Sequence, residues 1–542
     1  MPTSDGILAA ARAAGGARPR ALWSLREDVL VEPVEPDGSL LLRARWGDFR
    51  LDRPHPLVGE TLRRMSLGPI MLENVFAGAI PASGDGEPVV DQAGQTEVLR
   101  VLHRLQHLVV RSLGLEDAAQ PLLSVVPMAR EARFQPGRVD PARPVRLSRF
   151  AFLRTEGSGF VLEAPTALHR VELHRPESAR VVGMLGRPVR PAEIVPESGL
   201  SEPAVLAVLA QLSGAGLLSV AEDGGPDPEA SVELIRLSAP TFGEDLDPVL
   251  AAWSGVDLLF HTRSTTGRHD GPFGATYPLR GRTAPEPALR PLPDGRRHPL
   301  ARPDLKQVLA ADPVLTTVIE GRRSIREFGA TPFTAEQLGE FLHRTVRVRG
   351  LRPAPADDPS GEPVSDRPYP SGDGAYELEF YPAVRDCEGL PDGIYYYAPS
   401  EHCLIAVNES PEELDELFAE AAVGARLVTP PAVVVAITSR HRRLSWKFSG
   451  LAYALTLKHV GVVTQSMYLV GTAMGLATCA LRSGDIGLAD RALGVDWRAE
   501  TRVGGFVLGT LPEGGRPIRE GWSDPADFVG WDECANEVSA RG

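Results

Sequence analysis

Three arginines and a serine lie within five residues of one another in the 542-residue chain. The sequence GRRSIREFG contains Arg322, Arg323, Ser324 and Arg326. A guanidinium stays charged at neutral pH and binds phosphate through a planar fork of donors. The spacing is therefore compatible with an anion cradle, and equally with a solvated basic turn at a helix end.

A second stretch, residues 445–481, is long and mostly apolar, and it predicts a continuous helix over 445–476 that forms the spine of a core. Lys447 stands near its beginning, between Trp446 and Phe448. A lysine in such a setting is either an ordinary surface residue or the base of a proton-transfer site. Both interpretations stay open on the residues alone.

Charge and composition limit the classes of partner. The formal net charge of −14 argues against nucleic acid or an anionic membrane as the main partner. No run of eighteen apolar residues and no signal-peptide pattern occurs, so we expect neither a membrane span nor export. The four cysteines are scattered without a CxxC pair, so we expect no metal site and no disulfide framework, in keeping with a cytoplasmic location.

The length predicts several domains. We expect a flexible arm, two winged-helix-like units, a connecting segment with a proline-rich linker at its end, and a C-terminal catalytic domain. Their predicted bounds are 1–20, 21–126, 147–240, 241–300 and 301–542. Because the helices of the winged-helix-like units carry few basic residues, peptide binding or a structural role is favoured over DNA binding.

Local patterns give the expected elements. The Pro36-Asp37-Gly38 turn predicts a hairpin, and apolar spacing predicts helices over 55–69 and 98–114. The loop at 261–270 carries more polar side chains than a plain connector needs. Thr334 with Gln337 predicts a capped helix start, and the apolar run at 431–440 predicts a central buried strand. Alternating strands and helices make the C-terminal half an α/β or α+β domain.

Six motifs then occur in a fixed order: RRSIREF, PSGDGAYELEFY, GLPDGIYYYAP, WKF, HVGVVTQSMYLVGTAMGLATCAL and VGGFVLG. Together they resemble the SagB/ThcOx-type dehydrogenases, nitroreductase-like flavoproteins that oxidise azolines in ribosomally made peptides. The resemblance covers about residues 245–525. It implies an α+β fold with a mixed sheet and long core helices, and a homodimer with FMN at the subunit interface.

The resemblance also implies a set of cofactor contacts. Arg322, Arg323, Ser324 and Arg326 would hold the flavin phosphate and ribityl chain, and a glycine turn would approach the isoalloxazine. That turn comprises Ser371, Gly372, Asp373 and Gly374. Further contacts would come from Gln465, Leu481, Arg482, Ser483, Gly484 and Arg516. An ordinary loop after a helix is the alternative interpretation of residues 481–484.

The implied reaction removes a proton from Cα and transfers a hydride from Cβ to flavin N5, with dioxygen as the final acceptor. The family pattern places a tyrosine after the lysine, whereas this chain has Phe448 after Lys447. Three explanations are open: Lys447 acts alone, Tyr453 substitutes, or the reaction has changed or been lost. The implied partners are an azoline-containing precursor peptide and a cyclodehydratase. Another oxidoreductase activity and a flavin-free peptide-binding scaffold are the alternative functions.

Overall fold

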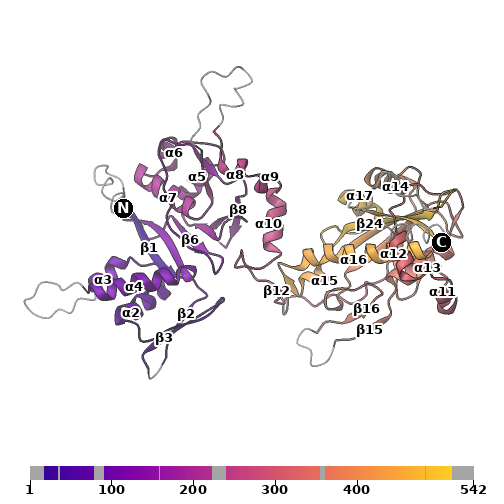
Figure 1. Cartoon of the computed structure of the whole chain (residues 1–542), viewed down its shortest axis with the longest axis horizontal. Helices are drawn as coiled ribbons and strands as arrows, with labels where there is room; N and C mark the ends of the chain where they lie inside the picture. The colour runs from indigo at the N-terminus through magenta and orange to yellow at the C-terminus, as the bar shows by residue number, and fades with distance from the viewer. Residues whose placement is uncertain are drawn as a thin grey trace, which may run out of the picture. The chain divides into compact units, whose positions relative to one another are not determined.

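The computed structural model describes residues 17–34, 37–78, 91–157, 159–222, 240–354, 361–482 and 484–515. The chain forms two compact units, Met1–Gly271 and Pro272–Gly542 (Figure 1). Within the described ranges, no helix is long and apolar enough to cross a membrane.

A six-stranded antiparallel sheet runs through the first unit in the order β1-β5-β6-β10-β9-β8. Its strands are β1 (Pro19–Leu25), β5 (Val109–Leu115), β6 (Leu123–Pro127), β8 (Phe152–Glu156), β9 (Gly159–Glu163) and β10 (His169–Leu173). The sheet therefore takes strands from both stretches that the sequence predicts to be winged-helix-like units.

Each half of the first unit adds three helices and a small antiparallel sheet. The first half has α2 (Pro56–Leu67), α3 (Leu72–Gly78) and α4 (Gln92–Arg104) with β2 (Leu30–Val34), β3 (Ser39–Ala44) and β4 (Gly47–Leu51). The second half has α5 (Pro176–Met184), α6 (Pro191–Ser198) and α7 (Glu202–Gly214) with β7 (Val145–Leu147) and β11 (Leu218–Val220). The hairpin and the helix predicted over 55–69 are confirmed, and the winged-helix interpretation stays a prediction.

The helix predicted over 98–114 is wrong in its second half. α4 ends at Arg104, a short 3₁₀ turn follows (η2, Gln106–Leu108), and the chain continues as β5. Leu99, expected on the buried face, is 51% exposed, whereas Leu108 and Val109 are buried. The apolar spacing was ambiguous here because a buried strand of β-branched and leucine residues also reads as a continuous apolar run.

The end of the first unit consists of α8 (Gly243–Leu246), α9 (Pro248–Ala251), α10 (Gly255–Arg263) and the lead-in loop, residues 261–271. Asp270 of this loop pairs with Arg26 at 3.0 Å and also with Arg170. Arg263 pairs with the buried Glu163 of β9. The polar side chains that exceed a connector's needs thus fasten this loop to its own unit.

The second unit is built on a seven-stranded sheet in the order β13-β20-β19-β17-β21-β24-β23. Its strands are β13 (Arg297–Pro299), β17 (Leu378–Val384), β19 (Gly393–Ala398), β20 (Cys403–Asn408), β21 (Val433–Arg440), β23 (Leu476–Leu481) and β24 (Glu500–Thr510). β21 is buried along its whole length between β17 and β24, as predicted. Its side chains alternate between two cores, so both faces of the sheet must be covered.

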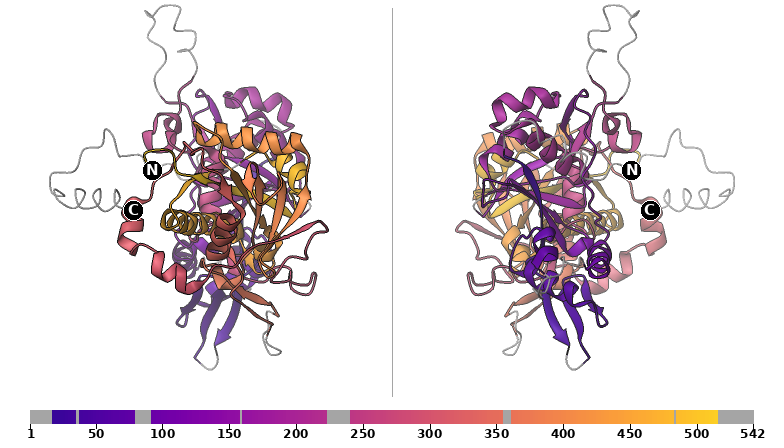
Figure 2. Two further views of the ribbon diagram at one scale, coloured as in Figure 1. Left: turned by 90° about the vertical axis from the view of Figure 1, so that its right-hand side faces the viewer. Right: turned by 90° about the vertical axis from the view of Figure 1, so that its left-hand side faces the viewer.

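Helices cover the two faces. α13 (Ala335–Val346), which begins with the predicted Thr334–Gln337 capping box, packs beside α16 (Ala452–Ala473). α16 crosses β17, β24 and β23 on that face (Figures 1 and 2). α14 (Pro411–Ala425) and α17 (Ile486–Leu493) pack together over the other face. Helices on both faces of this sheet confirm the α+β class. The expected mixed sheet is wrong, because every pair of neighbouring strands that the structure describes in it is antiparallel.

Short elements complete the second unit. They are α11 (Leu305–Ala311), α12 (Leu315–Gly321), α15 (His441–Ser445), η4 (Gly372–Gly374), β12 (Gly274–Ala275), β14 (Phe333–Thr334), β15 (Gly350–Arg352), β16 (Val364–Asp366), β18 (Cys387–Glu388) and β22 (Phe448–Ser449). β12 pairs with β22 and β13 pairs with β20. The expected proline-rich linker therefore lies between two strands that pair within this unit.

The continuous helix predicted over 445–476 is wrong at its beginning. α15 ends at Ser445, β22 follows, and α16 begins only at Ala452. Gly450 takes a left-handed φ of 68°, which a helix cannot include. Lys447 consequently lies in a loop before the helix, so a count of helical turns from Lys447 to Gln465 or Tyr453 does not give their relative faces.

Candidate active site

Lys447 is held between α15 and β22 by contacts on both sides. Its carbonyl accepts a hydrogen bond from the Tyr277 N–H at 2.9 Å, and the neighbouring Trp446 indole donates to the Thr283 carbonyl at 2.7 Å. The Lys447 side chain is only 14% exposed. Burial of this kind requires the ammonium to find partners within the chain.

Those partners are two carboxylates. Nζ of Lys447 lies 2.9 Å from Asp373 Oδ2 and 3.5 Å from Glu362 Oε2. Burial lowers the pKa of Lys447, but the hydrogen bond to Asp373 and the charges of Asp373 and Glu362 outweigh it and raise the pKa above its ordinary value. Lys447 is therefore an ammonium at neutral pH, and not the lysine neutralised by desolvation that a general base would need.

Asp373 belongs to the predicted glycine turn, residues 371–374. The turn is fixed by the Ser371 hydroxyl, which accepts a hydrogen bond from the Tyr376 N–H at 3.0 Å. The φ angles of Asp373 and Tyr376 are 52° and 46°, and Tyr277 on the other side of Lys447 also has a φ of 52°. Left-handed backbone in residues other than glycine is strained and gathers at functional sites.

A buried histidine supports the turn from below. Nδ1 of His459 lies 2.8 Å from the Glu377 carboxylate, which can only accept, so His459 donates there. Its Nε2 then accepts a hydrogen bond from the Gly372 N–H at 2.9 Å. Glu377 is fully buried, and His459 is 5% exposed. This pair fixes the position of the glycine turn against α16.

The arginine segment, residues 322–326, follows α12 and contacts the other end of α16. Ser324 Oγ lies 2.8 Å from the Tyr468 hydroxyl, and the Arg322 guanidinium lies 5.2 Å from the centre of the Tyr468 ring. Arg323 donates to the Arg322 carbonyl, and Arg326 donates to the Ala425 carbonyl, both at 2.8 Å. His459 and Tyr468 are nine residues apart, which is about 13.5 Å along the helix.

Two arginines of this segment, Arg322 and Arg326, differ from the ion-paired arginines of the first unit. In the part of the chain that the structure describes, no carboxylate forms an ion pair with Arg322 or Arg326. Arg322 is half-buried and Arg326 is exposed. Their guanidinium groups have the donor chemistry that a phosphate requires, so the segment fits the phosphate of a nucleotide cofactor.

The remaining predicted residues are more dispersed. Gln465 is exposed on α16, and Tyr453 in the first turn of that helix is 44% exposed with its ring 6.3 Å from the His441 ring. Leu481 ends β23 as a buried residue, and Arg482 after it is exposed. A Cβ at Gly484 would contact the Arg502 guanidinium and the Glu420 carboxylate, and these side-chain ends would have to move. Ser483 and Arg516 lie outside the described residues.

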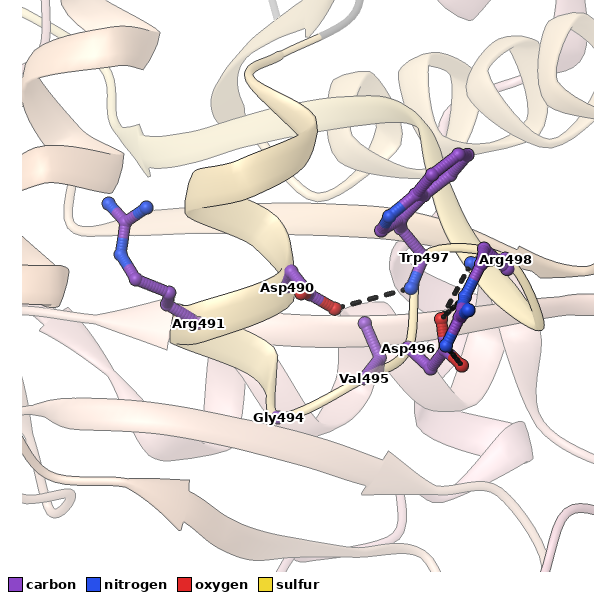
Figure 3. Close-up of a pocket in the computed structure, with 7 residues that line it drawn as sticks. All are labelled: Asp490, Arg491, Gly494, Val495, Asp496, Trp497 and Arg498. Carbon is purple, nitrogen blue, oxygen red and sulfur yellow. Dashed lines mark hydrogen bonds and ion pairs between the residues drawn. The ribbon is translucent and has the colours of Figure 1, made fainter.

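Two hollows lie on the surface of this unit. One, of about 540 Å³, is lined by the β15–β16 hairpin and by Ser371, Asp373 and Gly374 of the glycine turn. The other, of about 580 Å³, is lined by residues 490–498 (Figure 3). In the second, Asp490 accepts from the Trp497 N–H at 3.2 Å and Asp496 pairs with Arg498 at 2.9 Å, and no predicted residue takes part. The first hollow is therefore the better candidate for a substrate.

Sequence reasoning missed Tyr277 and Glu362, which lie next to Lys447, and Glu377, which supports the glycine turn through His459. Glu377 could have been found, since a carboxylate entering an apolar strand must be paired when buried. A further signal was available for Lys447 itself. The chain has only three lysines among its 57 lysines and arginines, so a lysine is an unusual choice of basic residue at any position in it. Among the described residues, no group of three or more histidine, cysteine or acidic side chains is placed to hold a metal.

Comparison with known proteins matches two stretches of the chain to protein families. Residues 145–270 match the family model of the cyanobactin oxidase ThcOx, and residues 319–510 match that of the nitroreductase family. MJ1384 of Methanocaldococcus jannaschii, named as a proposed nitroreductase, is 27% identical over 179 residues, which are 33% of this chain and 81% of that protein.

Two solved structures show weaker likeness. A proposed nitroreductase of Ralstonia eutropha JMP134 is 20% identical, with 42% of this chain and 98% of that chain covered and a TM-score of 0.32. The E. coli microcin synthetase McbBCD complex with truncated pro-MccB17 is 15% identical, with 53% and 99% covered and a TM-score of 0.30. The family models match a ThcOx-type segment over residues 145–270 and a nitroreductase-family domain over residues 319–510. The nitroreductase match lies within residues 245–525, for which the motifs predict the resemblance, whereas the ThcOx match lies mostly before them.

Proposed function

We propose that the chain is an FMN-dependent dehydrogenase that oxidises thiazoline or oxazoline rings to thiazoles or oxazoles in a ribosomally made peptide. One observation carries the proposal most directly. Lys447 is buried 2.9 Å from Asp373 of a strained glycine turn, inside a nitroreductase-family domain. The turn borders a hollow of about 540 Å³, a size suited to a five-membered ring with its flanking residues.

FMN fits the donors of the second unit. Nitroreductase-family proteins usually bind flavin. Arg322, Ser324 and Arg326 would hold the phosphate, and Gly372 and Gly374, which lack a Cβ, would allow close approach of the ring system. When bound, FMN would supply the two-electron acceptor that aromatisation of an azoline requires.

The chain's own residues would hold the glycine turn and place a positive charge at the site. His459 and Glu377 hold the glycine turn, and Asp373 with Glu362 keeps a positive charge on Lys447. A fixed cation next to the reacting carbon stabilises negative charge as the Cα proton leaves. Because the Lys447 ammonium is buried, its electrostatic attraction for that negative charge is stronger than it would be in water.

A homodimer is part of the proposal. α11 and α12, which lead to the arginine segment, carry apolar side chains that are 49–72% exposed in the single chain: Leu305, Leu309, Val314, Leu315 and Ile319. Exposed apolar stripes of this kind mark interaction surfaces. Light scattering of the purified protein is expected to give twice the 58.3 kDa mass of one chain.

The decisive experiment starts from the purified full-length protein. We expect a yellow protein that releases stoichiometric FMN on denaturation, and that removes two hydrogens per ring from an azoline-containing peptide, measured by mass spectrometry. Arg322→Ala should lose flavin, whereas Arg498→Ala, which removes an arginine that is 74% exposed, should retain it. A protein that stays colourless with added FMN would contradict the proposal.

Phe448 favours a second candidate function. Phe448 is 8% exposed and packs against Ala375, Leu444 and Ala452, so position 448 offers no hydroxyl to the site. An oxidoreductase acting on another peptide-linked or small substrate fits that change. Flavin content with no oxidation of either azoline would favour this second function.

A further inference from the structure

Two aromatic rings flank the Lys447 ammonium at nearly equal distances. Nζ lies 5.5 Å from the centre of the Phe448 ring and 5.9 Å from that of the Tyr277 ring. Only one of them carries a hydroxyl. Tyr277 comes from a segment 170 residues earlier in the chain, where no spacing argument would look for it.

The position of Tyr277 is held by its backbone and its ring. β12 pairs with β22, and the Tyr277 N–H donates to the Lys447 carbonyl at 2.9 Å (Figure 1, where β12 lies next to α15). The ring packs edge-on against Trp446 at 5.7 Å, and the Arg280 guanidinium lies 4.0 Å from its centre. The φ of 52° places this tyrosine in a strained conformation that the surrounding contacts must maintain.

The hydroxyl of Tyr277 is free to act. Within the described part of the chain it forms no hydrogen bond, and its side chain is half-buried. Lys447 Nζ stays on Asp373 and Glu362 and lies 5.9 Å from the centre of the Tyr277 ring, so its charge acts on the phenol through space. Negative charge that develops on this oxygen would meet two cations, Lys447 and Arg280.

We propose that Tyr277 is the proton acceptor of the site, in place of the tyrosine that the family pattern puts at position 448, with Lys447 as the cation beside it. The inference rests on the proposed function. The Cα–H bond breaks and a new O–H bond forms on the Tyr277 oxygen, while the phenolic proton passes from that oxygen to solvent. The electron pair of the broken bond enters the ring as the Cβ hydride leaves to the bound two-electron acceptor.

A first measurement needs no catalysis. The chain has nine tyrosines, so protein labelled with carbon-13 at tyrosine Cζ gives a spectrum simple enough to assign. The Tyr277 resonance, identified by its loss in Tyr277→Phe, should move in Lys447→Met. The Tyr395 resonance should not move, because that hydroxyl donates to the Pro391 carbonyl elsewhere in the unit. An unmoved Tyr277 resonance would overturn the pairing.

The second measurement is azoline oxidation by the flavin-loaded protein. Tyr277→Phe should lower kcat about 100-fold or more, the usual contribution of a proton-transfer group, with FMN content unchanged. Phe448→Tyr should restore part of the rate in the Tyr277→Phe background and change little in the native chain. Tyr395→Phe, a matched loss of a phenol, should keep its rate.

The outcomes separate the two proposals. A Tyr277→Phe protein that binds FMN and oxidises azolines at the native rate would overturn the role of Tyr277 and leave the proposed function intact. A native protein that binds FMN but oxidises no azoline would overturn the proposed function, and the role of Tyr277 with it.

Discussion

Two regions rich in arginine use the same side chain in opposite ways. In the first unit, Arg26 and Arg170 both face Asp270 of the lead-in loop, and Arg263 faces Glu163. In the second unit, Arg322 and Arg326 of the arginine segment have no carboxylate partner among the described residues. Both regions looked equally basic and polar in the sequence.

The presence or absence of a carboxylate partner separates structural arginines from arginines that can bind a ligand. A guanidinium satisfied by carboxylates of its own chain holds the fold together, and removing the carboxylate leaves a buried charge uncompensated. A guanidinium without such a partner keeps its donors for a ligand. Lys447 is an intermediate case, since it is paired with Asp373 and Glu362 yet lies at the candidate site.

The largest effect should come from breaking the paired region. Asp270→Ala leaves Arg26 and Arg170, which are 7% and 17% exposed, without their shared carboxylate. Arg26 keeps Asp28 and Arg170 keeps Glu172, so the change removes one charge-assisted hydrogen bond from each arginine. We expect the first unit to lose about 3 kcal/mol of unfolding free energy, measured by urea denaturation. Asp28→Ala is the control, because its side chain is 36% exposed and Arg26 keeps Asp270. Equal stability of the two variants would contradict a structural role for the loop.

The same pair predicts an acid-sensitive first unit. Burial raises the pKa of Asp270, but the charges of Arg170 and Arg26 outweigh it and hold the pKa below its ordinary value. The stabilisation is therefore complete above the unfolded pKa of about 3.9 and is lost as the pH falls through the lower folded pKa. The acid branch of the stability curve should be flatter in Asp270→Asn, which lacks the titrating group.

Changes to Arg322 and Arg326 should lower the affinity for FMN and leave the stability of the fold almost unchanged. Arg322→Ala combined with Arg326→Ala removes charged donors worth about 1.5 kcal/mol or more to a phosphate, so FMN affinity should fall at least about tenfold. The unfolding free energy of the flavin-free protein should change by less than about 0.5 kcal/mol. A large loss of stability with unchanged affinity would remove the distinction between the two regions.

A smaller loss of stability is expected where one arginine is removed and a second arginine still binds the same carboxylate. Arg263→Ala deprives Glu163 of one partner, but Arg154 still binds that carboxylate at 2.8 Å. We expect a loss of about 1 kcal/mol in the unfolding free energy of the first unit. The double change Arg154→Ala and Arg263→Ala should cost more than the two single changes together, because it leaves Glu163 buried without any cation.

The smallest effect is expected at Lys447, where a change of its partner Asp373 should alter a pKa. Asp373→Asn removes the hydrogen-bonded charge that raises the pKa of Lys447, so that pKa should fall while the fold is unaffected. Since the site needs the ammonium form, the alkaline limb of the pH–rate profile should move to lower pH. With only three lysines in the chain, nitrogen-15 labelling of lysine can follow Lys447 directly. An unmoved alkaline limb would show that the charge of Lys447 is not used.

The sequence predicted the parts of the second unit that depend on local pattern. β21 follows from its apolar run, and the start of α13 follows from its cap residues. The motif order predicted the nitroreductase-like fold. The split between α15 and α16 was missed because the left-handed turn at Gly450 is set by tertiary pairing of β22, and an apolar glycine-containing helix gives the same pattern.

The site was predictable only in its separate pieces. Spacing identified the arginine segment, the glycine turn and Lys447, and the structure joins Lys447 to the turn through Asp373. Tyr277 and Glu362 could not be placed, because each reaches Lys447 from a loop far away in sequence. Such non-local pairings depend on how strands are ordered in the sheet, which single-sequence patterns do not encode.

The pairing of β12 with β22 has a practical consequence for work with fragments and chimaeras. A piece of the protein that starts at residue 301, after the proline-rich stretch, would lack β12, Tyr277 and the Thr283 carbonyl that anchors Trp446. It would still contain every residue that the motifs identify from 322 to 509, and it would look complete by sequence. Transplanting the second unit into another protein would therefore require a cut near residue 271, because residues 272–300 hold the loop of Lys447 in place.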